Sequence, residues 1–452
     1  MSILIIGGGD IGATLCERLA VEGKDVVVVE ASEERVRHLR EAADVQLVHG
    51  NGASPRVLRE AGLDDAEMLI AVTNSDEVNL IACLVATQES VIPTKIARVR
   101  DPDLAAAVPG IFGDQGLDLN INPEEEAAHA VLKTLKAPGA VGVFEFAAGR
   151  VQVVALSVDA PCEAAGVVLA DLRSRLGIEC NIVAISRDEA LLIPDGRAEL
   201  RVGDLIYAAG RPDALARLAE LLGKKAAPAR RIVISGGGST TYYLARLLEE
   251  DDEVSTKIIE QDGDRCKFLV ERLKRAVVLH GNGTDPALLG EENVAGADAF
   301  IALTADDEDN VLSALLAKRE GAAKVMALVN KPSYAPLVKA IGIDAVVSPN
   351  RAAVSAILHF IRKGKVVSVT TVGEEAAEAL EVVALETSEL VGRPLREAGF
   401  KGAIVGAIVR GDDVIIPGGD DQIEAGDHVV IFALRSAIPA LERQMMVQLQ
   451  YF

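Results

Sequence analysis

Aromatic side chains are scarce in this chain, and tryptophan is absent. Only 3% of its 452 residues are aromatic, whereas 50% are hydrophobic. Aliphatic side chains must therefore form the cores, as they do in buried parallel strands and the helices that cover them. This hydrophobic content excludes a disordered chain, and the length predicts three or four compact units rather than one.

Cysteine is also rare, and its placement excludes the common metal and redox motifs. The five cysteines show no Cys-x-x-Cys pair and no spacing typical of a zinc site. We expect buried, reduced thiols in a cytoplasmic protein. No apolar run approaches the roughly 18 residues that span a bilayer, so we expect no transmembrane helix. The first strand is predicted to begin at Ile3, so we also expect no signal peptide.

Basic residues are fewer than acidic ones in this chain. Asp and Glu number 68 against 46 Lys and Arg, which gives a formal net charge of −22. Nucleic-acid binding requires a basic face that neutralises phosphates, and none is evident, so we expect no nucleic-acid partner. The charge suits a positively charged partner, such as the Lys- and Arg-rich cytoplasmic loops of a membrane protein. A plain role in solubility explains it equally well.

What the sequence does contain is an internal repeat. The phrase ILIIGGGDIG, followed by VVVVE and VHGNG, returns about 230 residues later as RIVISGGGST, followed by KIIEQ and LHGNG. In both halves, strand-like segments alternate with helical ones, which predicts a doubly wound parallel sheet of six strands. Repetition on this scale indicates duplicated domains rather than a solenoid.

A different pattern follows each of these predicted sheets. Short β-type runs that close with a helix occur twice, as the pair LRVGDLIYAAG and IEAGDHVVIFA illustrates. We therefore predict an α/β chain with two doubly wound, Rossmann-like parallel sheets, each followed by a small α+β C-terminal lobe. The expected parts are a first Rossmann-like lobe at 1–139, its small lobe at 140–222, a linker at 223–230, a second Rossmann-like lobe at 231–364 and its small lobe at 365–452.

The glycine-rich turn of the first half has the spacing of a dinucleotide site. Gly7, Gly9 and Gly12 form a G-x-G-x-x-G motif between a strand and a helix. There the glycines permit a tight turn, approach of a pyrophosphate and close packing of helix on strand. Glu30, eighteen residues after Gly12, ends the second strand and can accept both ribose hydroxyls of an adenosine. Its carboxylate would repel a 2′-phosphate, which favours NAD over NADP.

Polar residues end the neighbouring strands at the same sheet edge. Asn51 could hydrogen-bond the adenine, whereas His49 is better explained as a structural residue than as a base. Thr73 and Asn74 follow the fourth strand and could line the ligand. Ser75 and Asp76, which come next, are candidate N-caps of the following helix.

Two arginines alternate on the predicted fifth strand, 95–100. Arg98 and Arg100 should therefore point the same way. They could reach a phosphate or a neighbouring subunit, or form a simple surface pair, and the sequence leaves these alternatives open.

The second half repeats the site with substitutions. Gly236, Gly237 and Gly238 are followed by Ser239 and Thr240, and Thr241 replaces the third motif glycine. A β-branched residue there should push the helix away from the strand. The other recurring candidates are Glu260, Asn282 and Thr304, while the arginine positions read Ala327 and Val329. We expect a weaker or differently selective site, with vacancy as the alternative.

Neither half shows catalytic groups. The histidines form no repeated set beyond His49 and His280, and the small lobes have no paired carboxylates, nucleophile elbow or metal spacing. We therefore assign no catalytic and no metal-binding residue. Duplicated binding lobes favour a switch with several ligand states. One alternative is a soluble NAD-dependent oxidoreductase, and another is a nucleotide-binding scaffold with no link to transport.

Longer motifs carry a resemblance to a known family. They are GGGDIG (7–12), HGNGASPRVLREAGLDDAEMLIAVTNSDEVN (49–79), IARVR (96–100), HGNG (280–283), ALTADDEDN (302–310) and AIVRGDDVIIP (407–417). With them the chain resembles, essentially end to end, the cytosolic regulatory subunits of bacterial Trk potassium uptake systems. These subunits contain tandem RCK domains, which regulate potassium conductance. Each RCK domain has a nucleotide-binding lobe and a smaller C-terminal lobe.

The resemblance implies a regulatory subunit rather than an enzyme. Its implied location is cytoplasmic and peripheral, at the inner face of the plasma membrane, against the integral-membrane potassium-translocating subunit. The implied assembly is a homotetrameric ring of eight RCK domains. NAD(H) is the implied regulator, and ATP or ADP remains open. Some ATP-binding relatives carry an arginine where this chain has Asp10, and that carboxylate would repel a γ-phosphate.

Motif spacing and resemblance together give the expected nucleotide contacts. Those in the first half are Gly7, Gly8, Gly9, Asp10, Ile11, Gly12, Glu30, Asn51, Thr73, Asn74 and Arg98. Those in the second half are Gly236, Gly237, Gly238, Ser239, Thr240, Glu260, Asn282 and Thr304.

Overall fold

The computed structural model describes most of the chain. The described residues are 2–21, 23–42, 45–113, 116–172, 177–188, 190–224, 228–331, 334–361, 368–372, 377–399 and 401–445. Part of the expected linker, 225–227, lies outside them. The chain forms two compact units, one of Met1–Ala127 with Ser348–Ile361 and one of Ala128–Val347 with Arg362–Phe452.

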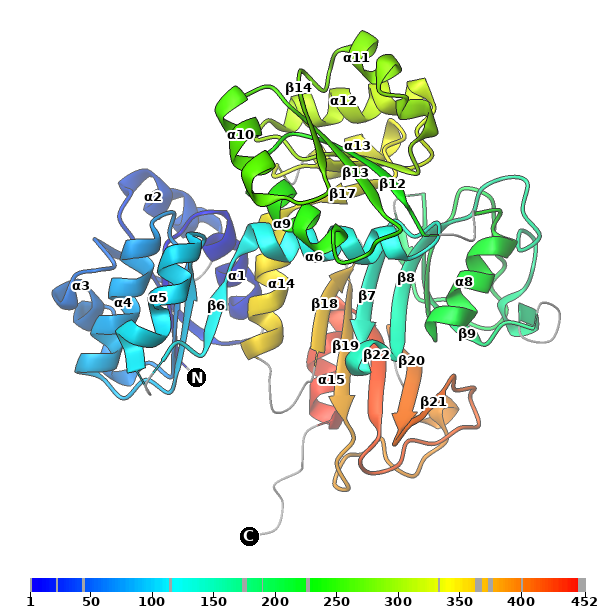
Figure 1. The fold of residues 1–452 in the computed structure, drawn as a ribbon. Helices are drawn as coiled ribbons and strands as arrows, with labels where there is room; N and C mark the ends of the chain where they lie inside the picture. The colour runs from blue at the N-terminus through cyan, green and yellow to red at the C-terminus, as the bar shows by residue number, and fades with distance from the viewer. Residues whose placement is uncertain are drawn as a thin grey trace. The chain divides into compact units, whose positions relative to one another are not determined.

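The first unit contains a six-stranded parallel sheet in the order β3-β2-β1-β4-β5-β6 (Figure 1). Its strands are β1 (Ser2–Ile6), β2 (Asp25–Glu30), β3 (Gln46–His49), β4 (Met68–Ala71), β5 (Thr94–Arg98) and β6 (Leu119–Ile121). Its helical segments are α1 (Asp10–Val21), α2 (Glu33–Ala42), α3 (Pro55–Glu60), η1 (Leu63–Asp65), α4 (Asp76–Glu89), α5 (Pro102–Phe112) and the start of α6 (Pro123–Lys136). The strand order confirms the doubly wound sheet predicted from the sequence.

The second unit contains a matching six-stranded sheet in the order β14-β13-β12-β15-β16-β17. Its strands are β12 (Arg231–Ser235), β13 (Ser255–Glu260), β14 (Val277–His280), β15 (Ala299–Ala302), β16 (Val325–Leu328) and β17 (Ala345–Val347). The helical segments around it are α9 (Ser239–Leu248), α10 (Gly263–Arg272), α11 (Pro286–Glu291), η5 (Val294–Gly296), α12 (Asp307–Glu320) and α13 (Tyr334–Ala340). The central strands of both sheets read as unbroken apolar runs because helices cover both faces.

Helix α14 (Pro349–Ile361) follows the second sheet in sequence but packs on the first. Figure 1 shows it beside α1. It lies in one core cluster with Ile5 and Leu15 of the first lobe. The residues that α14 buries there, each at most 3% exposed, are Ala353, Val354, Ile357 and Leu358. A segment from the second repeat therefore completes the core of the first Rossmann-like lobe.

Each small lobe has a five-stranded antiparallel sheet. The first, in the order β10-β9-β11-β8-β7, contains β7 (Gly142–Phe146), β8 (Val151–Ser157), β9 (Cys180–Arg187), β10 (Ala190–Leu192), β11 (Leu205–Gly210), η3 (Ala147–Gly149), η4 (Leu169–Asp171) and α8 (Pro212–Leu221). The second, in the order β18-β19-β22-β20-β21, contains β18 (Ser368–Val372), β19 (Ala377–Val383), β20 (Ala403–Arg410), β21 (Asp413–Ile415), β22 (His428–Leu434), η6 (Leu395–Glu397), η7 (Arg435–Ala437) and α15 (Ile438–Met445). The duplication of the small lobe predicted from the sequence is confirmed.

The two small-lobe sheets share one apolar cluster and pack face to face. Small residues allow the approach, since a Cβ on Gly406 would lie 2.7 Å from the Cβ of Ala209. The rings of Tyr207 and Phe432 meet there with centroids 5.9 Å apart. The cores on the opposite faces include residues of α8 and of α15. No helix in the described ranges has the length and apolar content needed to cross a bilayer.

An ion pair between a partly exposed arginine and a buried aspartate recurs in both small lobes. Arg187 donates from Nε and Nη2 to the two carboxylate oxygens of Asp204, both at 2.7 Å. Arg410 donates in the same way to Asp427 at 2.9 and 2.8 Å. Burial acts to raise the pKa of each carboxyl, but the arginine and backbone hydrogen bonds outweigh it and hold both pKa values below the ordinary value. Each arginine ends one strand and each aspartate directly precedes a neighbouring strand, so each pair links two adjacent strands of its sheet.

We expect Asp204→Asn and Asp427→Asn each to lower the free energy of unfolding by about 2 kcal/mol at neutral pH, because each aspartate is buried and its arginine partly exposed. A carboxylate whose folded pKa lies below its unfolded value stabilises the fold above the unfolded pKa, near about 4. That contribution is lost as the pH falls through the folded pKa. Urea denaturation should therefore show the difference between wild type and variant shrinking below about pH 4. An equal difference at pH 7 and at low pH would contradict the assignment.

Candidate functional site

The first glycine turn joins β1 to α1 at the carboxyl edge of the sheet. Gly7 has a φ of +103°, and a Cβ there would lie 3.0 Å from the backbone of Thr73. A Cβ on Gly12 would lie 1.9 Å from the carbonyl oxygen of Gly7. A Cβ on Gly9 meets nothing closer than 3.9 Å. Packing therefore requires glycine at Gly7 and Gly12, while the turn stays open at Gly9, where the motif places the pyrophosphate.

Glu30 connects the second strand to this turn. Its side chain is buried, at 6% exposure. Oε2 accepts a hydrogen bond from the Gly8 amide at 2.6 Å, and Oε1 accepts one from the Ser32 amide at 2.7 Å. Each carboxylate oxygen can accept a further bond, so the same group can still receive ribose hydroxyls.

Asn79 positions the loop after β4, and sequence reasoning missed it. The residue is fully buried, and its Oδ1 accepts from the amide and the hydroxyl of Thr73 at 2.8 and 2.7 Å. Its Nδ2 donates to the carbonyls of Thr73 and Arg98 at 3.1 and 2.8 Å. Asn79 therefore fixes Thr73 against the end of β5. The sequence does contain a sign of this role, because an asparagine follows the threonine by six residues in both halves, in TNSDEVN and in TADDEDN.

The same network is present in the second lobe. Asn310 is fully buried, and its Oδ1 accepts from the amide and the hydroxyl of Thr304 at 2.7 and 2.8 Å. Its Nδ2 donates to the carbonyls of Thr304 and Leu328, both at 3.0 Å. The two Rossmann-like lobes thus share one scaffold for the loop that faces the glycine turn.

Arg98 and Arg100 do not form a surface pair. Strand β5 ends at Arg98, so Arg100 follows the strand instead of lying on it. Arg98 is 8% exposed and donates from Nη1 to Asn74 Oδ1 at 3.1 Å, while Arg100 donates to the Asn74 carbonyl at 2.6 Å. Burial, and then the charge of Arg100, lower the pKa of Arg98. Within the described part of the chain its Nε has no acceptor, and a ligand oxygen would supply one.

Of the two expected N-caps, only Ser75 has that role. Its Oγ accepts the Val78 amide at 3.2 Å at the start of α4. Asp76 instead accepts the amides of Arg100 and Asp101, both at 2.8 Å. It therefore holds the loop after β5.

His49 and Asn51 are engaged in local turns. His49 Nε2 lies 3.0 Å from the carbonyl oxygen of Ala31, and His280 Nε2 lies 2.9 Å from that of Gln261. The repeat of this contact supports the structural role expected for His49. Asn51 Oδ1 accepts the Ala53 amide at 2.9 Å, which leaves its amide donors for a base.

The first glycine turn is in contact with residues of both repeats. Asp10 begins α1 and is exposed, whereas the side chain of Ile11 is 3% exposed in the core, so only its backbone can face a ligand. Asn350, in the first turn of α14, donates from Nδ2 to Asp10 Oδ2 at 3.2 Å. Sequence reasoning could not find this contact, because it depends on the packing of α14.

The second glycine turn holds a side chain where the first has no room. Thr241 is fully buried and donates from Oγ1 to the Gly236 carbonyl at 2.7 Å. A Cβ on Gly238 meets nothing closer than 3.8 Å, so this turn is open at the position that matches Gly9. Ser239 begins α9, and the side chain of Thr240 is buried beside it.

Glu260 and Asn282 repeat the contacts of their first-half counterparts. Glu260 accepts the amides of Gly237 and, at 2.7 Å, of Asp262. Asn282 Oδ1 accepts the Thr284 amide at 2.9 Å.

The residues that replace the two arginines lie one position further along than expected. Asn310 binds the Leu328 carbonyl as Asn79 binds that of Arg98, and Asp307 accepts the Asn330 amide at 3.0 Å as Asp76 accepts that of Arg100. Leu328 and Asn330 are therefore the equivalents, and the prediction of Ala327 and Val329 was wrong. In the second repeat the connection from the asparagine to this carbonyl is one residue shorter, 18 residues instead of 19, whereas the prediction assumed a shortening of two.

The two glycine turns are a feature of many nucleotide-binding proteins, and comparison with known proteins decides the family. The TrkA-N domain model matches residues 3–123 and 232–349, and the TrkA-C domain model matches residues 153–223 and 379–446. The chain belongs to the TrkA family. It is similar to the Trk system potassium uptake protein TrkA of Halomonas elongata, with 40% identity over 100% of both chains. The protein of the same name from Haemophilus influenzae is 35% identical over 98% of both chains.

Solved structures share the fold of this TrkA-family chain. The crystal structure of the GsuK RCK domain superposes with a TM-score of 0.59 at 20% identity, covering 98% of this chain and 94% of that one. The GsuK channel bound to NAD gives a TM-score of 0.59 at 21% identity, covering 98% and 78%. GsuK bound to ADP gives a TM-score of 0.50 at 16% identity, covering 80% and 69%. At these identities the likeness shows the fold alone.

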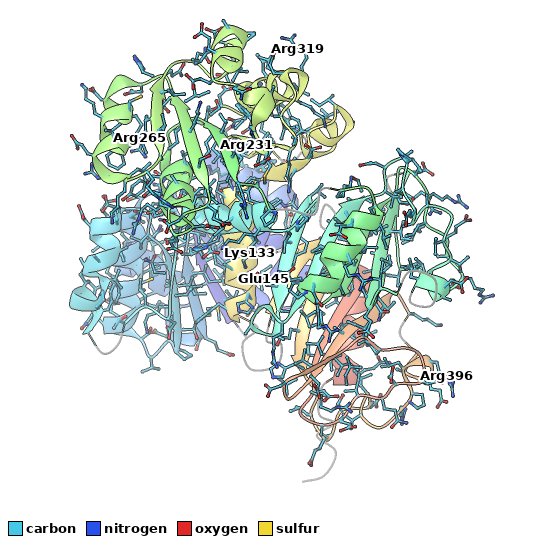
Figure 2. All side chains as sticks on the ribbon, turned by 45° about the vertical axis from the view of Figure 1, so that its right-hand side comes forward. Lys133, Glu145, Arg231, Arg265, Arg319 and Arg396 are labelled. Carbon is cyan, nitrogen blue, oxygen red and sulfur yellow. The ribbon has the colours of Figure 1, made fainter. Side chains whose placement is uncertain are left out.

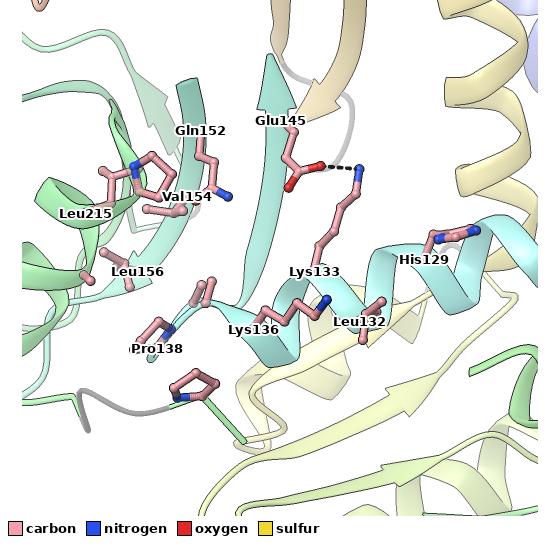
Figure 3. A pocket seen from close by; sticks show the side chains of 15 residues that line it. His129, Leu132, Lys133, Lys136, Pro138, Glu145, Gln152, Val154, Leu156 and Leu215 are labelled. Atoms are coloured by element: carbon pink, nitrogen blue, oxygen red, sulfur yellow. Dashed lines mark ion pairs between the residues drawn. The ribbon is translucent and has the colours of Figure 1, made fainter. Parts of the chain in front are cut away.

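A pocket of about 520 Å³ lies near the junction of the first TrkA-N and TrkA-C matches (Figure 3). Helix α6 lines one side, where Lys133 forms an ion pair with Glu145 at 2.9 Å. Val154 and Leu156 of β8 and Leu215 of α8 line another. None of the residues expected to contact a nucleotide lines it. Among the described residues, no group of three or more His, Cys, Asp or Glu could hold a metal ion.

Proposed function

We propose that this chain is a cytosolic, nucleotide-sensing regulatory subunit that gates a Trk-type potassium uptake channel. The observation that carries the proposal is the duplicated arrangement of an open glycine turn, a carboxylate on the turn and a buried asparagine behind it. We call these two candidate sites the first and the second cleft. NAD(H) is the proposed ligand of the first cleft, because Glu30 suits an unphosphorylated ribose and Arg98 suits a pyrophosphate. ATP or ADP is a second regulator. The relatives named as potassium uptake proteins support the link to transport, and GsuK bound to NAD or to ADP supports the ligand class.

Regulation requires that the ligand bind two states of the protein unequally. A nucleotide shifts the equilibrium between two arrangements of the lobes only by its difference in affinity for them. In this chain α14 gives the first cleft a direct route to the second repeat, because its buried face belongs to the first core and its Asn350 contacts Asp10. Occupancy of the cleft thus acts on a helix that leads into the second small lobe.

We also propose that the subunit assembles as a homotetramer at the inner face of the membrane, against the potassium-translocating subunit. Ile81 on α4 is 43% exposed, and Leu312, two residues after the buried asparagine in α12 as Ile81 is in α4, is 48% exposed. Large apolar side chains exposed at equivalent places on both repeats fit repeated contacts between RCK domains.

Potassium flux tests the proposal. The membrane subunit of the same system is placed in liposomes with wild-type protein or with Gly9→Glu/Gly238→Glu. Both positions have room for a Cβ, so the variant should fold, while its carboxylates repel the phosphates. We expect NAD or NADH to change the flux with wild type and to have no effect with the variant. A potassium flux that does not change with any adenine nucleotide would overturn the proposal. Turnover of the cofactor would favour an oxidoreductase.

A further inference from the structure

Arg265 lies across the second glycine turn and is held there from two sides. It sits in the first turn of α10, and its Nε donates to the carbonyl of Gly237. Its guanidinium carbon lies 4.1 Å from the centroid of the Phe268 ring, while that of Arg272 lies 4.0 Å from the same centroid. The ring of Tyr242 meets Phe268 edge-on at 5.5 Å. Figure 2 labels Arg265 on the second Rossmann-like lobe.

The first repeat has no aromatic residue at the two positions equivalent to Phe268 and Tyr242. Arg35 occupies the position equivalent to Arg265 in α2, but it is exposed, and its Nη1 would lie 3.9 Å from a Cβ added to Gly9. His38 stands where the second repeat has Phe268, and Ala13 stands where it has Tyr242. The same fold forms without the aromatic support, so the fold does not require it. Aromatic residues make up only 3% of the chain, so the aromatic rings that meet beside this cleft are a distinctive feature of the second repeat.

We infer that Arg265 is the base-stacking residue of the second cleft, with its guanidinium plane lying against the adenine of a bound nucleotide. The inference deepens the proposed function and rests on it. Glu260, which accepts ribose hydroxyls, shares the glycine turn with Arg265, because the carboxylate receives the Gly237 amide and the guanidinium binds the Gly237 carbonyl. A base attached to that ribose therefore lies beside the first turn of α10.

The chemistry of the guanidinium suits this role. It is planar and weakly hydrated, and it stacks on π-systems from either face. Arg265 is half-buried, so part of the plane remains open to a ligand while Phe268 supports it. Burial lowers its pKa, the nearby carboxylate of Glu260 raises it, and the group stays charged at neutral pH.

The positions of the cationic side chains in the two clefts indicate the class of ligand. In the first cleft Arg98 is at the phosphate end, whereas Leu328 and Asn330 replace both arginines there in the second. The second cleft has its cation at the base end instead. Its ligand is therefore an adenosine nucleotide recognised mainly through base and ribose, whose affinity depends little on the number of phosphates.

Calorimetric titration with the first cleft blocked by Gly9→Glu tests this inference. We expect ADP and AMP to bind within a few-fold of each other and ADP to bind better than UDP, whose smaller base stacks less. Arg265→Met should weaken ADP about tenfold and UDP much less. Arg265→Lys should lose most of the same preference, since an ammonium has no plane. Arg272→Met is the matched control, because it removes the second cation from Phe268 without touching the turn, and it should change ADP affinity less than about twofold.

The outcomes separate this inference from the proposed function. A purely structural Arg265 would change thermal stability and leave the ADP to UDP ratio unchanged, which would overturn the inference. An absence of any ADP binding with the first cleft blocked would also overturn it, while NAD binding by wild type would leave the proposed function standing. If Arg265→Met does not fold, Arg265→Lys, which keeps the charge and most of the side-chain length, supplies the same comparison.

Discussion

Replacing Gly12 with valine should abolish nucleotide binding at the first cleft and lower the free energy of unfolding by about 3 kcal/mol or more. The reason is steric, because a Cβ at this position would lie 1.9 Å from the carbonyl oxygen of Gly7. Helix α1 must move away from β1, and the amides of the turn lose their common direction toward a phosphate. Thermal denaturation and NAD titration measure the two effects.

Thr241→Gly is the matched control in the second repeat. It removes one buried hydrogen bond, to Gly236, and places a glycine in a helix, so each loss costs about 1 kcal/mol. The second cleft should keep its ligand, because a smaller side chain obstructs nothing. Equal loss of binding in the two variants would show that the third motif position does not set the geometry of the turn.

The second large effect is expected from Asn79→Ala. The substitution removes the hydrogen-bond partner of the partly buried amide and carbonyl of Thr73 and of the buried carbonyl of Arg98. Each unsatisfied buried group costs about 1–3 kcal/mol, so we expect a loss of about 4 kcal/mol in the free energy of unfolding. NAD affinity at the first cleft should fall as well, because Thr73 and Asn74 lose their fixed position.

Asn310→Ala provides the comparison within the same chain. It breaks the same network in the second lobe, so its cost in stability should be similar. It should, however, leave NAD binding at the first cleft unchanged. A loss of first-cleft affinity in Asn310→Ala as large as in Asn79→Ala would mean that the effect is general destabilisation and not local positioning.

Sequence alone predicted the two doubly wound parallel sheets, the duplicated lobes and both glycine turns, because these depend on local patterns. Helical and strand periodicity mark each element, and the glycine motif marks the turn that joins β1 to α1. The substitution at Thr241 was also visible, since it interrupts a motif of fixed spacing.

The packing of α14 could not be predicted. Its apolar face has the period of any helix that covers a sheet, and nothing in that period says which of two similar sheets it covers. Asn350 at the first cleft depends on that choice.

Two other features depended on alignment and on three-dimensional contact. Only the hydrogen bonds show that Leu328 and Asn330 are the equivalents of the two arginines. The connection is one residue shorter in the second repeat, which shifts the alignment of the two repeats without changing their composition visibly. Arg265 has an equivalent in Arg35, but only the contacts with Gly237 and Phe268 distinguish the two.

One titration decides whether the chain has two unequal nucleotide clefts, as we propose. NAD and ADP are titrated calorimetrically into wild type, Gly9→Glu and Gly238→Glu, whose substituted positions both have room for a Cβ. We expect two classes of site in wild type with different preferences for NAD and ADP, of which each variant loses one and keeps the other. A single class of identical sites, or binding that neither variant alters, would contradict it.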